Sequence, residues 1–421
     1  MSDILIKNVH IIDPDNSTDG IGDIFIKNGV FADAEAAEGN VEIINGSGLK
    51  AAPGLVDLHV HLRDPGQTDK EDIISGCKAA AAGGVTSLLA MPNTTPAVDN
   101  PDTVRYIKEK AKEADARVYV VGSITKGLDG HEATDIDALY EAGVYALSDD
   151  GRPVVDTSIM VAAMKKAAEL GIKVTAHCED PYLAGGKVNE GRISVELKVK
   201  GMPAAAEDAG TAREIALAMS YDLPVHICHV STATSVRMIR EAKKAGVKIT
   251  AETAPHYLML TEDALLSRDA DYRMNPPLRT EEDRQALIEA LKDGTIDAIA
   301  TDHAPHTPEE KADFETAPNG VIGMETSFAA AYTALVKGGV MSEAELIRKM
   351  SCNPAGILNI PAGTMYVGAP ADLFLYKDEE WTVDPDKLHG KSKNTPFKGM
   401  TLAAKVKMTI CGGKIVYKDL G

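Results

Sequence analysis

The sequence has few cysteines and no long apolar run, and its first residues lead us to expect no leader segment. No stretch reaches the about 18 consecutive apolar residues that a membrane-spanning helix needs. Met1-Ser2-Asp3-Ile4 lacks the basic flank and apolar segment of a signal peptide. The cysteines are odd in number and show no CxxC spacing, which favours reduced thiols in a cytoplasmic protein over a disulfide framework: Cys77, Cys178, Cys228, Cys352 and Cys411.

Positive charge is also scarce. Lys and Arg total 44 against 63 Asp and Glu, a formal net charge of −19. This charge repels phosphate backbones, so nucleic acid is a poor candidate partner, and an anionic substrate would need a local positive centre. The 421 residues, 44% hydrophobic and 25% charged, are ordinary for a globular protein and predict two or three domains.

The two ends of the chain are rich in β-strand patterns. Near the N-terminus, 4–12, 23–27 and 41–44 read as strands separated by Asn-Gly turns, and near the C-terminus 371–376, 403–410 and 414–417 do so. Neither end is long enough to bury a good core alone. We therefore predict one composite β-sandwich domain from residues 1–52 and 364–421.

Between these ends, apolar runs alternate with segments of helical periodicity. Lys70–Ala82 is predicted to be a helix with a Thr68–Glu71 capping box, and Pro101 to open the next. Eight runs over residues 53–363 predict a (β/α)8 TIM-type barrel. The alternative, a doubly wound open sheet, is less favoured because no GxGxxG turn follows the first predicted strand. The runs are Leu55–His59, Val85–Met91, Val118–Val121, Val144–Leu147, Ile172–Ala176, Val225–Cys228, Val247–Ala251 and Ala298–Ala300.

Potential metal ligands follow five of the eight predicted strands. His59 and His61 lie two residues apart, so both imidazoles point to one face of the strand. Each feature alone has an ordinary explanation, such as a turn or a core histidine, but in a barrel all of them share one rim. Four imidazoles with two carboxylates exceed one tetrahedral set, which predicts two Zn²⁺ ions. The further ligands are Asp149 or Asp150, His177, His229 and Asp302.

Such a centre would carry out hydrolysis, or its reverse, at an amide or ester carbonyl. Two zinc ions, two carboxylates and a bridging hydroxide sum to one positive charge, which provides the local positive centre. Zinc lowers the pKa of bound water to about 7, so a metal-bridging hydroxide is the expected nucleophile. Asp302 is suited to pass a proton from that water to the leaving nitrogen as general acid and base.

Six motifs make the chain similar to the metal-dependent amidohydrolase superfamily and, within it, to the bacterial class I dihydroorotase family. The resemblance covers essentially the whole chain and implies a zinc-binding (β/α)8 barrel flanked by a β-sandwich. The family catalyses the reversible cyclisation of N-carbamoyl-L-aspartate to (S)-dihydroorotate, the third step of pyrimidine biosynthesis. The motifs are Asp57–Gly66, Met91–Thr94, Ala176–Asp180, His229–Ala233, Met274–Arg279 and Thr301–His306.

The resemblance also assigns roles. It implies that His59, His61 and Asp302 bind one zinc ion and His177 and His229 the other, with Asp150, preferred over Asp149, between them. Arg63, Asn93 and His306 resemble groups that hold the substrate carboxylate, and Asn275 a contact to the ring. His61 and the backbone at Asn319 and Gly320 complete the implied substrate contacts. We read His256 and His303 as structural, or as supports for the ligands.

Two departures from relatives matter. Many hydantoinases and dihydropyrimidinases bridge their metals with a carboxylated lysine after strand four, but Gly143–Gly151 contains no lysine. An aspartate there favours the class I dihydroorotases. The second departure is Asn319, which stands where the family usually has Phe before Gly320. The polar stretch His303–Gly323 around it is a candidate lid.

Two alternatives remain open. One is another cyclic amidase, a hydantoinase or allantoinase. The other is a non-catalytic dihydroorotase-like subunit of aspartate carbamoyltransferase, although such proteins lose metal ligands and every ligand position here is filled. The resemblance further implies a homodimer and allows association with aspartate carbamoyltransferase, and no membrane partner is expected.

Overall fold

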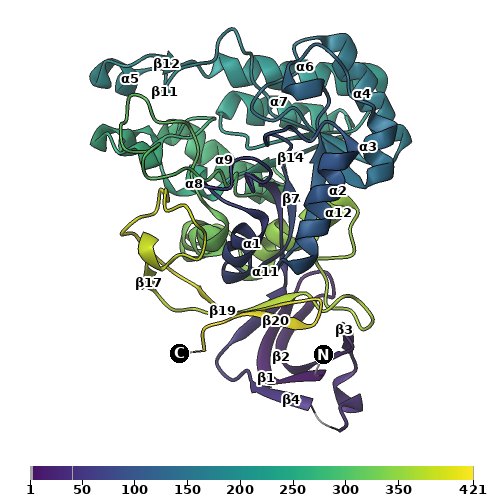
Figure 1. Ribbon diagram of the computed structural model, residues 1–421. Helices are drawn as coiled ribbons and strands as arrows, with labels where there is room; N and C mark the ends of the chain where they lie inside the picture. The colour runs from purple at the N-terminus through teal and green to yellow at the C-terminus, as the bar shows by residue number, and fades with distance from the viewer. Residues whose placement is uncertain (1–2, 40, 421) are drawn as a thin grey trace.

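The computed structural model describes residues 3–39 and 41–420. Its larger part is a sheet of eight parallel strands with helices packed around it (Figure 1). These strands coincide with the eight apolar runs of the sequence, so the predicted barrel strands are confirmed. They are β6 (Leu55–Val60), β7 (Val85–Ala90), β8 (Arg117–Gly122), β9 (Val144–Leu147), β10 (Lys173–Ala176), β13 (Val225–Ile227), β14 (Ile249–Thr253) and β15 (Ala298–Ile299).

The first and eighth strands meet, which closes the sheet into a barrel. Val60 forms a parallel bridge with His303. The Asp57 carboxylate accepts hydrogen bonds from the Thr301 backbone N–H at 3.0 Å and from its hydroxyl at 2.6 Å. A buried carboxylate that takes two donors from the opposite strand fixes the register of the closing pair. The predicted (β/α)8 architecture is therefore confirmed.

The main barrel helices follow the strands in turn. They are α1 (Ile73–Ala82), α2 (Pro101–Lys110), α3 (Ile136–Ala142), α4 (Thr157–Glu169), α6 (Ala205–Tyr221), α7 (Ala233–Lys244), α9 (Glu281–Asp293) and the interrupted set α10 (Ser327–Ala331), α11 (Glu343–Ile347) and α12 (Asn353–Leu358). Two short helices lie in excursions: α5 (Arg192–Leu197), between the paired β11 (Val188–Asn189) and β12 (Gly201–Met202), and α8 (Pro255–Met259).

The predicted start of the first helix is wrong. α1 begins at Ile73, and its capping box joins Asp72 to Ser75 rather than Thr68 to Glu71. The reason is that the buried Glu71 carboxylate is already bound by the backbone N–H of Lys391 and the Ser75 hydroxyl. A contact from far along the chain thus overrides the local capping signal.

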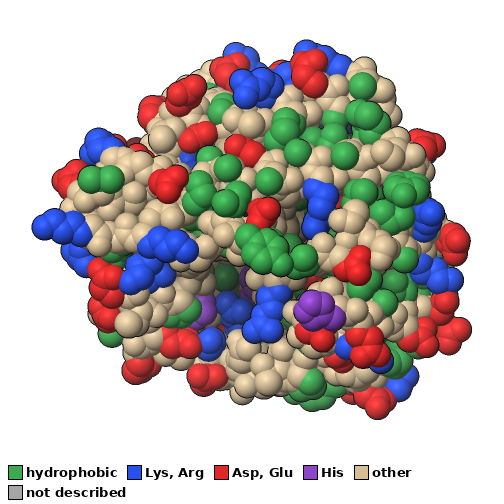
Figure 2. Space-filling view, turned by 90° about the horizontal axis from the view of Figure 1, so that it is seen from above, with side chains coloured by type: hydrophobic (Ala, Val, Ile, Leu, Met, Phe, Trp, Pro, Cys, Tyr) green, Lys and Arg blue, Asp and Glu red, His purple; other side chains and the backbone are tan. Residues whose placement is uncertain are grey.

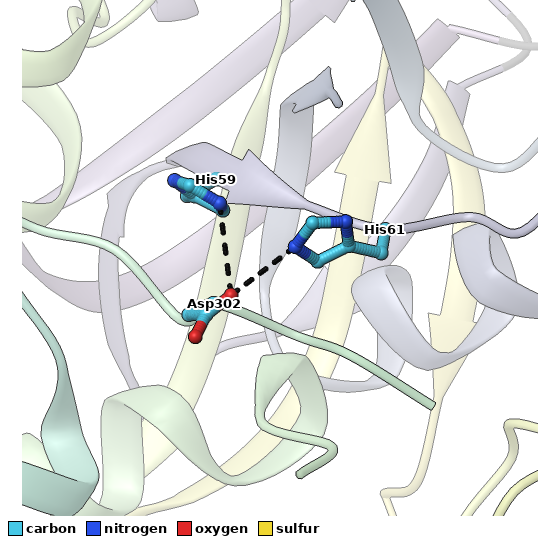
Figure 3. A group of neighbouring side chains, drawn as sticks. All are labelled: His59, His61 and Asp302. Carbon is cyan, nitrogen blue, oxygen red and sulfur yellow. Dashed lines mark hydrogen bonds and ion pairs between the residues drawn. The ribbon is translucent and has the colours of Figure 1, made fainter. Parts of the chain in front are cut away.

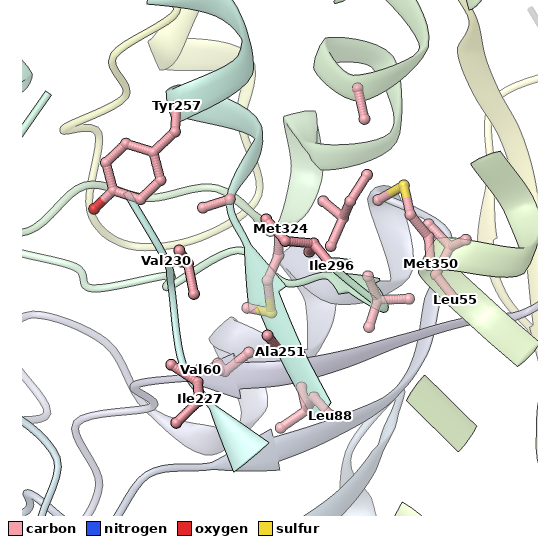
Figure 4. Packing of buried hydrophobic residues seen from close by; sticks show 14 of the residues in the cluster. Leu55, Val60, Leu88, Ile227, Val230, Ala251, Tyr257, Ile296, Met324 and Met350 are labelled. Carbon is pink, nitrogen blue, oxygen red and sulfur yellow. The ribbon is translucent and has the colours of Figure 1, made fainter. Parts of the chain in front are cut away.

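Apolar side chains fill the space between the barrel strands and the surrounding helices. Figure 4 shows part of this core, where Val60, Leu88 and Ile227 from three strands lie with Met324 and Met350. All are at most 3% exposed. This packing gives the strand ends a rigid base on which polar side chains can be placed.

Strands from both chain ends form one second sheet below the barrel (Figure 1). Its order is β20-β19-β16-β5-β1-β2-β3, with β4 also paired to β1. The predicted turn at Asn28-Gly29 is confirmed, since both residues have positive φ (52° and 83°), and it joins β2 to β3, a strand that was not predicted. The strands are β1 (Asp3–Asp13), β2 (Thr18–Lys27), β3 (Val30–Ala32), β4 (Val41–Asn45), β5 (Lys50–Pro53), β16 (Leu373–Lys377), β19 (Lys405–Cys411) and β20 (Lys414–Lys418).

β16 joins the sheet to the barrel. Leu373 and Leu375 belong to the core of the second sheet, whereas Phe374 and Tyr376 point the other way and join the barrel core. Between β16 and β19 the chain leaves the sheet, forms the small pair β17 (Trp381–Thr382) and β18 (Thr401–Leu402), and contacts the barrel. The predicted domain boundaries at 52/53 and 363/364 stay a prediction.

Two observations concern the cysteines and the helices. All five cysteines are free thiols, and three of them are buried. Across residues 3–39 and 41–420, the helices fall short of the combined length and hydropathy that a bilayer crossing requires.

Candidate active site

His59 and His61, at the end of the first barrel strand, face the carboxylate of Asp302, which follows the eighth strand. His59 lies on β6 and His61 just beyond it, and both side chains point toward Asp302 (Figure 3). The Nε2 atoms lie 3.6 Å and 3.2 Å from the same oxygen, Asp302 Oδ1. The predicted spacing of two along a strand therefore does bring both rings to one face.

Asp150 lies at the centre of the four histidines. Its carboxylate oxygens lie within 3.7 Å of one nitrogen on each ring. The separations are 3.2 Å to His59, 3.5 Å to His61, 3.5 Å to His177 and 3.7 Å to His229. A carboxylate in this position can bridge two cations held by these rings.

Asp149 has a different environment. Its oxygens accept hydrogen bonds from the backbone N–H groups of Ile124 at 2.7 Å and Thr125 at 3.1 Å, and from the Thr125 hydroxyl. It thereby ties the loop after β9 to the loop after β8. Of the two candidate aspartates, the structure thus brings Asp150 to the cluster and leaves Asp149 as a loop anchor.

Unusual backbone angles at the strand ends aim some of these side chains. Arg63, His229 and Asp302 have φ values of 60°, 34° and 48°, in the left-handed region that residues other than glycine rarely adopt. Such conformations cost on the order of 1–3 kcal/mol each and persist where the surrounding structure enforces them. Their coincidence on one rim marks it as the functional end of the barrel.

The two carboxylates are ionised at neutral pH. Burial raises the pKa of Asp302, but the interactions with His61 and the nearby histidines outweigh it and bring the pKa to about 2. For Asp150 burial acts in the same sense, and the charge of His59 outweighs it, so its pKa lies well below the ordinary value. Both side chains therefore offer negatively charged oxygens to a cation.

The residues present suit a metal such as zinc. Within residues 3–39 and 41–420, the buried atoms His59 Nε2, Asp150 Oδ1 and His177 Nε2 find no hydrogen-bond partner. Buried polar atoms without partners are costly, and imidazole nitrogens with carboxylate oxygens are the donor set that zinc prefers. Three three-residue groups have ligand atoms within 4.8 Å of one another: His59–His61–Asp302, His59–Asp150–His229 and His59–Cys228–Glu252.

A cavity of about 220 Å³ opens beside this cluster. Figure 2 looks onto the upper face of the molecule and shows a hollow in which histidine and Lys or Arg side chains are visible. The volume lies below that of cavities for drug-sized ligands, so it suits a small metabolite. Every predicted site residue except the fully buried His59 lines it: His61, Arg63, Asn93, Asp150, His177, His229, Asn275, Asp302, His306, Asn319 and Gly320, with Gly151 and Ala304.

The cationic side of the cavity is formed by Arg63. Its Nε donates to the Pro305 carbonyl oxygen at 3.2 Å, which holds the guanidinium plane toward the loop after β15. Burial lowers the pKa of Arg63 to about 10, so it remains charged at neutral pH. A buried planar cation of this kind is suited to a carboxylate ligand.

His306 lies next to Arg63. Its Nε2 is 3.0 Å from the Asn319 carbonyl oxygen, and its Nδ1 is 3.0 Å from Glu310 Oε2. Burial and the Arg63 charge lower the pKa of His306 to about 4. The ring is therefore neutral at pH 7 and carries one N–H, so it can donate to only one of these two oxygens at a time.

The two asparagines of the cavity differ in their contacts. Asn93 Oδ1 accepts a hydrogen bond from His61 Nδ1 at 2.7 Å, which leaves His61 Nε2 for the cluster. Asn275 Nδ2 donates to Glu179 Oε2 at 2.9 Å, and its Oδ1 has no partner within the described residues. Asn275 Oδ1 is therefore a buried acceptor without a partner beside the cavity, while Asn93 also orients a cluster histidine.

Asn319, which stands where the family usually has phenylalanine, makes a side-chain contact that phenylalanine could not make. The Asn319 side chain accepts a hydrogen bond from Arg273 Nη2 at 3.1 Å, which an aromatic ring could not do. Gly320 has φ of 142°, and a Cβ there would lie 2.8 Å from the Ala304 carbonyl oxygen. Glycine is thus required at 320, whereas the Asn319 side chain is held by Arg273, which lies between β14 and α9.

Sequence reasoning missed Glu252. This fully buried carboxylate on β14 lies 3.5 Å from His59 Nδ1 and 3.1 Å from His226 Nε2. Acceptors on the far nitrogen of a metal-binding histidine fix its tautomer. The signal was present, since Glu252 directly follows the apolar run Val247–Ala251 on the rim that carries the other ligands.

His256 and His303 lie near the cluster. Burial lowers their pKa values to about 4 and about 3, so both rings are neutral. The backbone N–H of Gly323 donates to His303 Nδ1 at 3.1 Å. His303 thus supports the loop after β15, and the role of His256 stays a prediction.

Comparisons with known proteins agree on one family. Residues 51–416 match the amidohydrolase family. The chain is 50% identical to a dihydroorotase of Geobacter metallireducens, with 99% of each covered, and 47% identical to a dihydroorotase of Clostridioides difficile, with 98% of this chain and 99% of that one covered.

Solved structures of similar fold carry other names. The L-hydantoinase (dihydropyrimidinase) of Arthrobacter aurescens has a TM-score of 0.89 at 25% identity, with 100% of this chain and 97% of that one covered. A dihydropyrimidinase of Brevibacillus agri has a TM-score of 0.86 at 25% identity, with 99% and 95% covered. The sequence relatives and the structural neighbours therefore share a barrel and differ in named activity.

Proposed function

Because the chain belongs to the amidohydrolase family, we propose that it is a zinc-dependent dihydroorotase of the bacterial class I type. The reaction is the reversible cyclisation of N-carbamoyl-L-aspartate to (S)-dihydroorotate, in pyrimidine biosynthesis. The observation that carries the proposal is one cavity holding both an aspartate surrounded by four histidines and the buried Arg63 cation. The first set suits amide hydrolysis and the second suits a carboxylated substrate.

In this proposal two zinc ions occupy the cluster. His59, His61 and Asp302 would hold one, His177 and His229 the other, and Asp150 would serve both. When bound, zinc would acidify water and polarise a carbonyl group. The chain's own contribution is to orient the rings, because Asn93 Oδ1 lies 2.7 Å from the far nitrogen of His61 and the Glu252 carboxylate lies 3.5 Å from the far nitrogen of His59.

Asp302 is the proposed general acid and base. It is ionised and borders the cavity, so it can accept a proton from water. In the hydrolytic direction the ring amide C–N bond breaks, the water oxygen joins the carbonyl carbon, and Asp302 returns the proton to the leaving nitrogen. Ring closure follows the same steps in reverse and releases water.

Arg63 and the loop after β15 provide the proposed specificity. Arg63 would pair with the ring carboxylate, with Asn93, His306 and the backbone at Asn319 and Gly320 completing that side, and Asn275 would contact the ring. Hydantoin has no carboxylate to pair with Arg63. The described lining of the cavity also contains no lysine that could bridge metals as in many hydantoinases.

One assay separates the candidates. Purified protein is tested on dihydroorotate and on hydantoin before chelation, after chelation and after zinc is restored, with metal content measured each time. The proposal expects dihydroorotate turnover that is lost and restored with the metal. Turnover of hydantoin alone would identify a hydantoinase, and no turnover at full metal content would support a non-catalytic subunit of aspartate carbamoyltransferase.

Two aspects of assembly belong to the same proposal. We expect a homodimer, and association with aspartate carbamoyltransferase is compatible with an active enzyme. Sedimentation of the protein alone and mixed with that transferase tests both.

A further inference from the structure

A segment outside the barrel sequence reaches the substrate cavity. Residues 388–398 lie between β17 and β18, where the C-terminal part of the chain has left the second sheet. Asn394, near the middle of this segment, is 4% exposed. A buried asparagine must have its amide hydrogen-bonded, so its partners show what it stabilises.

All side-chain partners of Asn394 are backbone groups of cavity-lining residues. Its Nδ2 donates to the carbonyl oxygens of Ala304 at 3.3 Å and Gly320 at 3.0 Å. Its Oδ1 accepts from the His306 backbone N–H at 3.2 Å. One amide therefore joins the two stretches of the loop after β15 that face the cavity.

The backbone of Asn394 adds a fourth contact. Its carbonyl oxygen accepts from the Ile322 N–H at 3.1 Å, just after the stretch that contains Gly320. Gly320 has a second support, since its own carbonyl oxygen also accepts from Lys311 Nζ at 2.9 Å. The backbone N–H of His306, in contrast, donates to Asn394 alone among the described residues.

We propose that Asn394 is a positioning residue for the substrate carboxylate. It acts through His306 and Gly320, whose spacing from Arg63 it sets, and it has no part in the proton transfer or in the metal cluster. This inference rests on the proposed function, because the carboxylate is that of dihydroorotate. The C-terminal segment thereby completes a site whose other predicted residues all come from the barrel.

The same segment offers a matched control. Ser392 is 2% exposed and donates its hydroxyl to the Lys70 carbonyl oxygen at 2.7 Å, which is not part of the cavity lining. Ser392→Ala removes a buried hydrogen bond from the same docked segment without touching His306 or Gly320. It therefore reports the effect of weaker docking while every direct contact of Asn394 stays in place.

The experiment compares Asn394→Ala, Asn394→Asp and Ser392→Ala with the wild type. Asn394→Asp keeps the shape and the acceptor for His306 but loses both donors. For each protein, kcat and KM for dihydroorotate, the inhibition constant of orotate, the zinc content and the melting temperature are measured. Orotate carries the carboxylate and is not hydrolysed, so its inhibition constant reports positioning without chemistry.

Asn394→Ala is expected to raise KM and the orotate inhibition constant together by roughly tenfold, as the loss of one or two net hydrogen bonds predicts. kcat and zinc content should stay within about twofold by the same estimate, and Ser392→Ala should match the wild type in KM. Asn394→Asp should raise both constants as well.

Three results would overturn the inference. They are equal KM values for Asn394→Ala and Ser392→Ala, a fall in kcat or zinc content with KM unchanged, and failure of both Asn394 variants to fold while Ser392→Ala folds. A wild type that does not turn over dihydroorotate would instead refute the proposed function.

Discussion

The inner and outer halves of the site cavity are built differently. The inner half consists of side chains that directly follow barrel strands, such as His61, Asp150 and His177, and β-sheet geometry fixes their positions. The outer half consists of the loop after β15, held by Lys311 within the loop and by Arg273 and Asn394 from two distant segments. The inner half thus depends on the fold itself, and the outer half on a few long-range hydrogen bonds. Chemistry should be sensitive to the first, and substrate affinity to the second.

The largest effect is expected from Asp302→Asn in the inner half. Asparagine is nearly the same size but cannot take up a proton, so kcat should fall by roughly 10²–10⁴-fold, the usual contribution of a general acid and base. Metal content should stay close to that of the wild type, since the histidines remain. Activity assays with metal analysis by mass spectrometry measure both.

His177→Ala is the partner variant, which should lose metal as well as activity. If Asp302→Asn retained near-wild-type rates, Asp302 would have no role in proton transfer. If it lost as much metal as His177→Ala, its effect could not be assigned to the proton.

A smaller effect is expected from Glu252→Gln, at the buried carboxylate beside His59 of the inner half. The Glu252 carboxylate has two oxygens for two imidazoles, whereas glutamine offers one acceptor, so His59 or His226 loses its partner. Loss of such a support usually weakens metal binding by about 10–100-fold. Competition with a zinc-binding dye measures the affinity. Glu214→Gln, a buried glutamate of α6 that pairs with Arg213, is the control and should leave zinc affinity unchanged.

The two halves also differ in how far they could be predicted from the sequence. The alternation of apolar runs with helical segments was enough to predict the barrel. Because the carboxyl ends of parallel strands lie on one rim, it also placed His59, His61, His177, His229 and Asp302 together. It could not choose between Asp149 and Asp150, since both follow β9 and only the contact of Asp149 with Thr125 separates them.

The hydrogen bonds that hold the outer half could not be predicted from the sequence pattern. Nothing in the local sequence around Asn394 indicates that it binds a loop some 70–90 residues earlier. The capping box at Thr68–Glu71 failed for a related reason, because Glu71 is bound by Lys391 of the same C-terminal segment. Long-range hydrogen bonds of this kind carry no periodicity.

Arg63→Met tests the residue at the boundary between the two halves of the cavity, where Arg63 contacts the loop after β15. Methionine keeps much of the length but removes the charge, and a hydrogen bond to a charged group contributes about 1.5–3 kcal/mol, so KM for dihydroorotate should rise about 10–100-fold with little change in kcat. Arg63→Lys keeps the charge without the planar fork and should give an intermediate KM. Steady-state kinetics measures all three proteins. Unchanged affinity in Arg63→Met would remove this residue from substrate recognition.

The smallest effect is expected from Asn319→Phe in the outer half. The substitution removes one side-chain hydrogen bond to Arg273 but keeps the Asn319 carbonyl oxygen that faces His306. A hydrogen bond to a charged guanidinium contributes about 1.5–3 kcal/mol, but this bond stabilises the loop and does not touch the substrate, so KM should change by no more than about tenfold while kcat and zinc content stay constant. Asn319→Ala removes the same bond without adding a ring. Equal KM values in the two variants would assign the change to the Arg273 contact, and a lower KM in Asn319→Phe alone would show that the ring shields the cavity. A hundredfold fall in kcat in either variant would contradict the division itself, because the outer half would then take part in the chemistry.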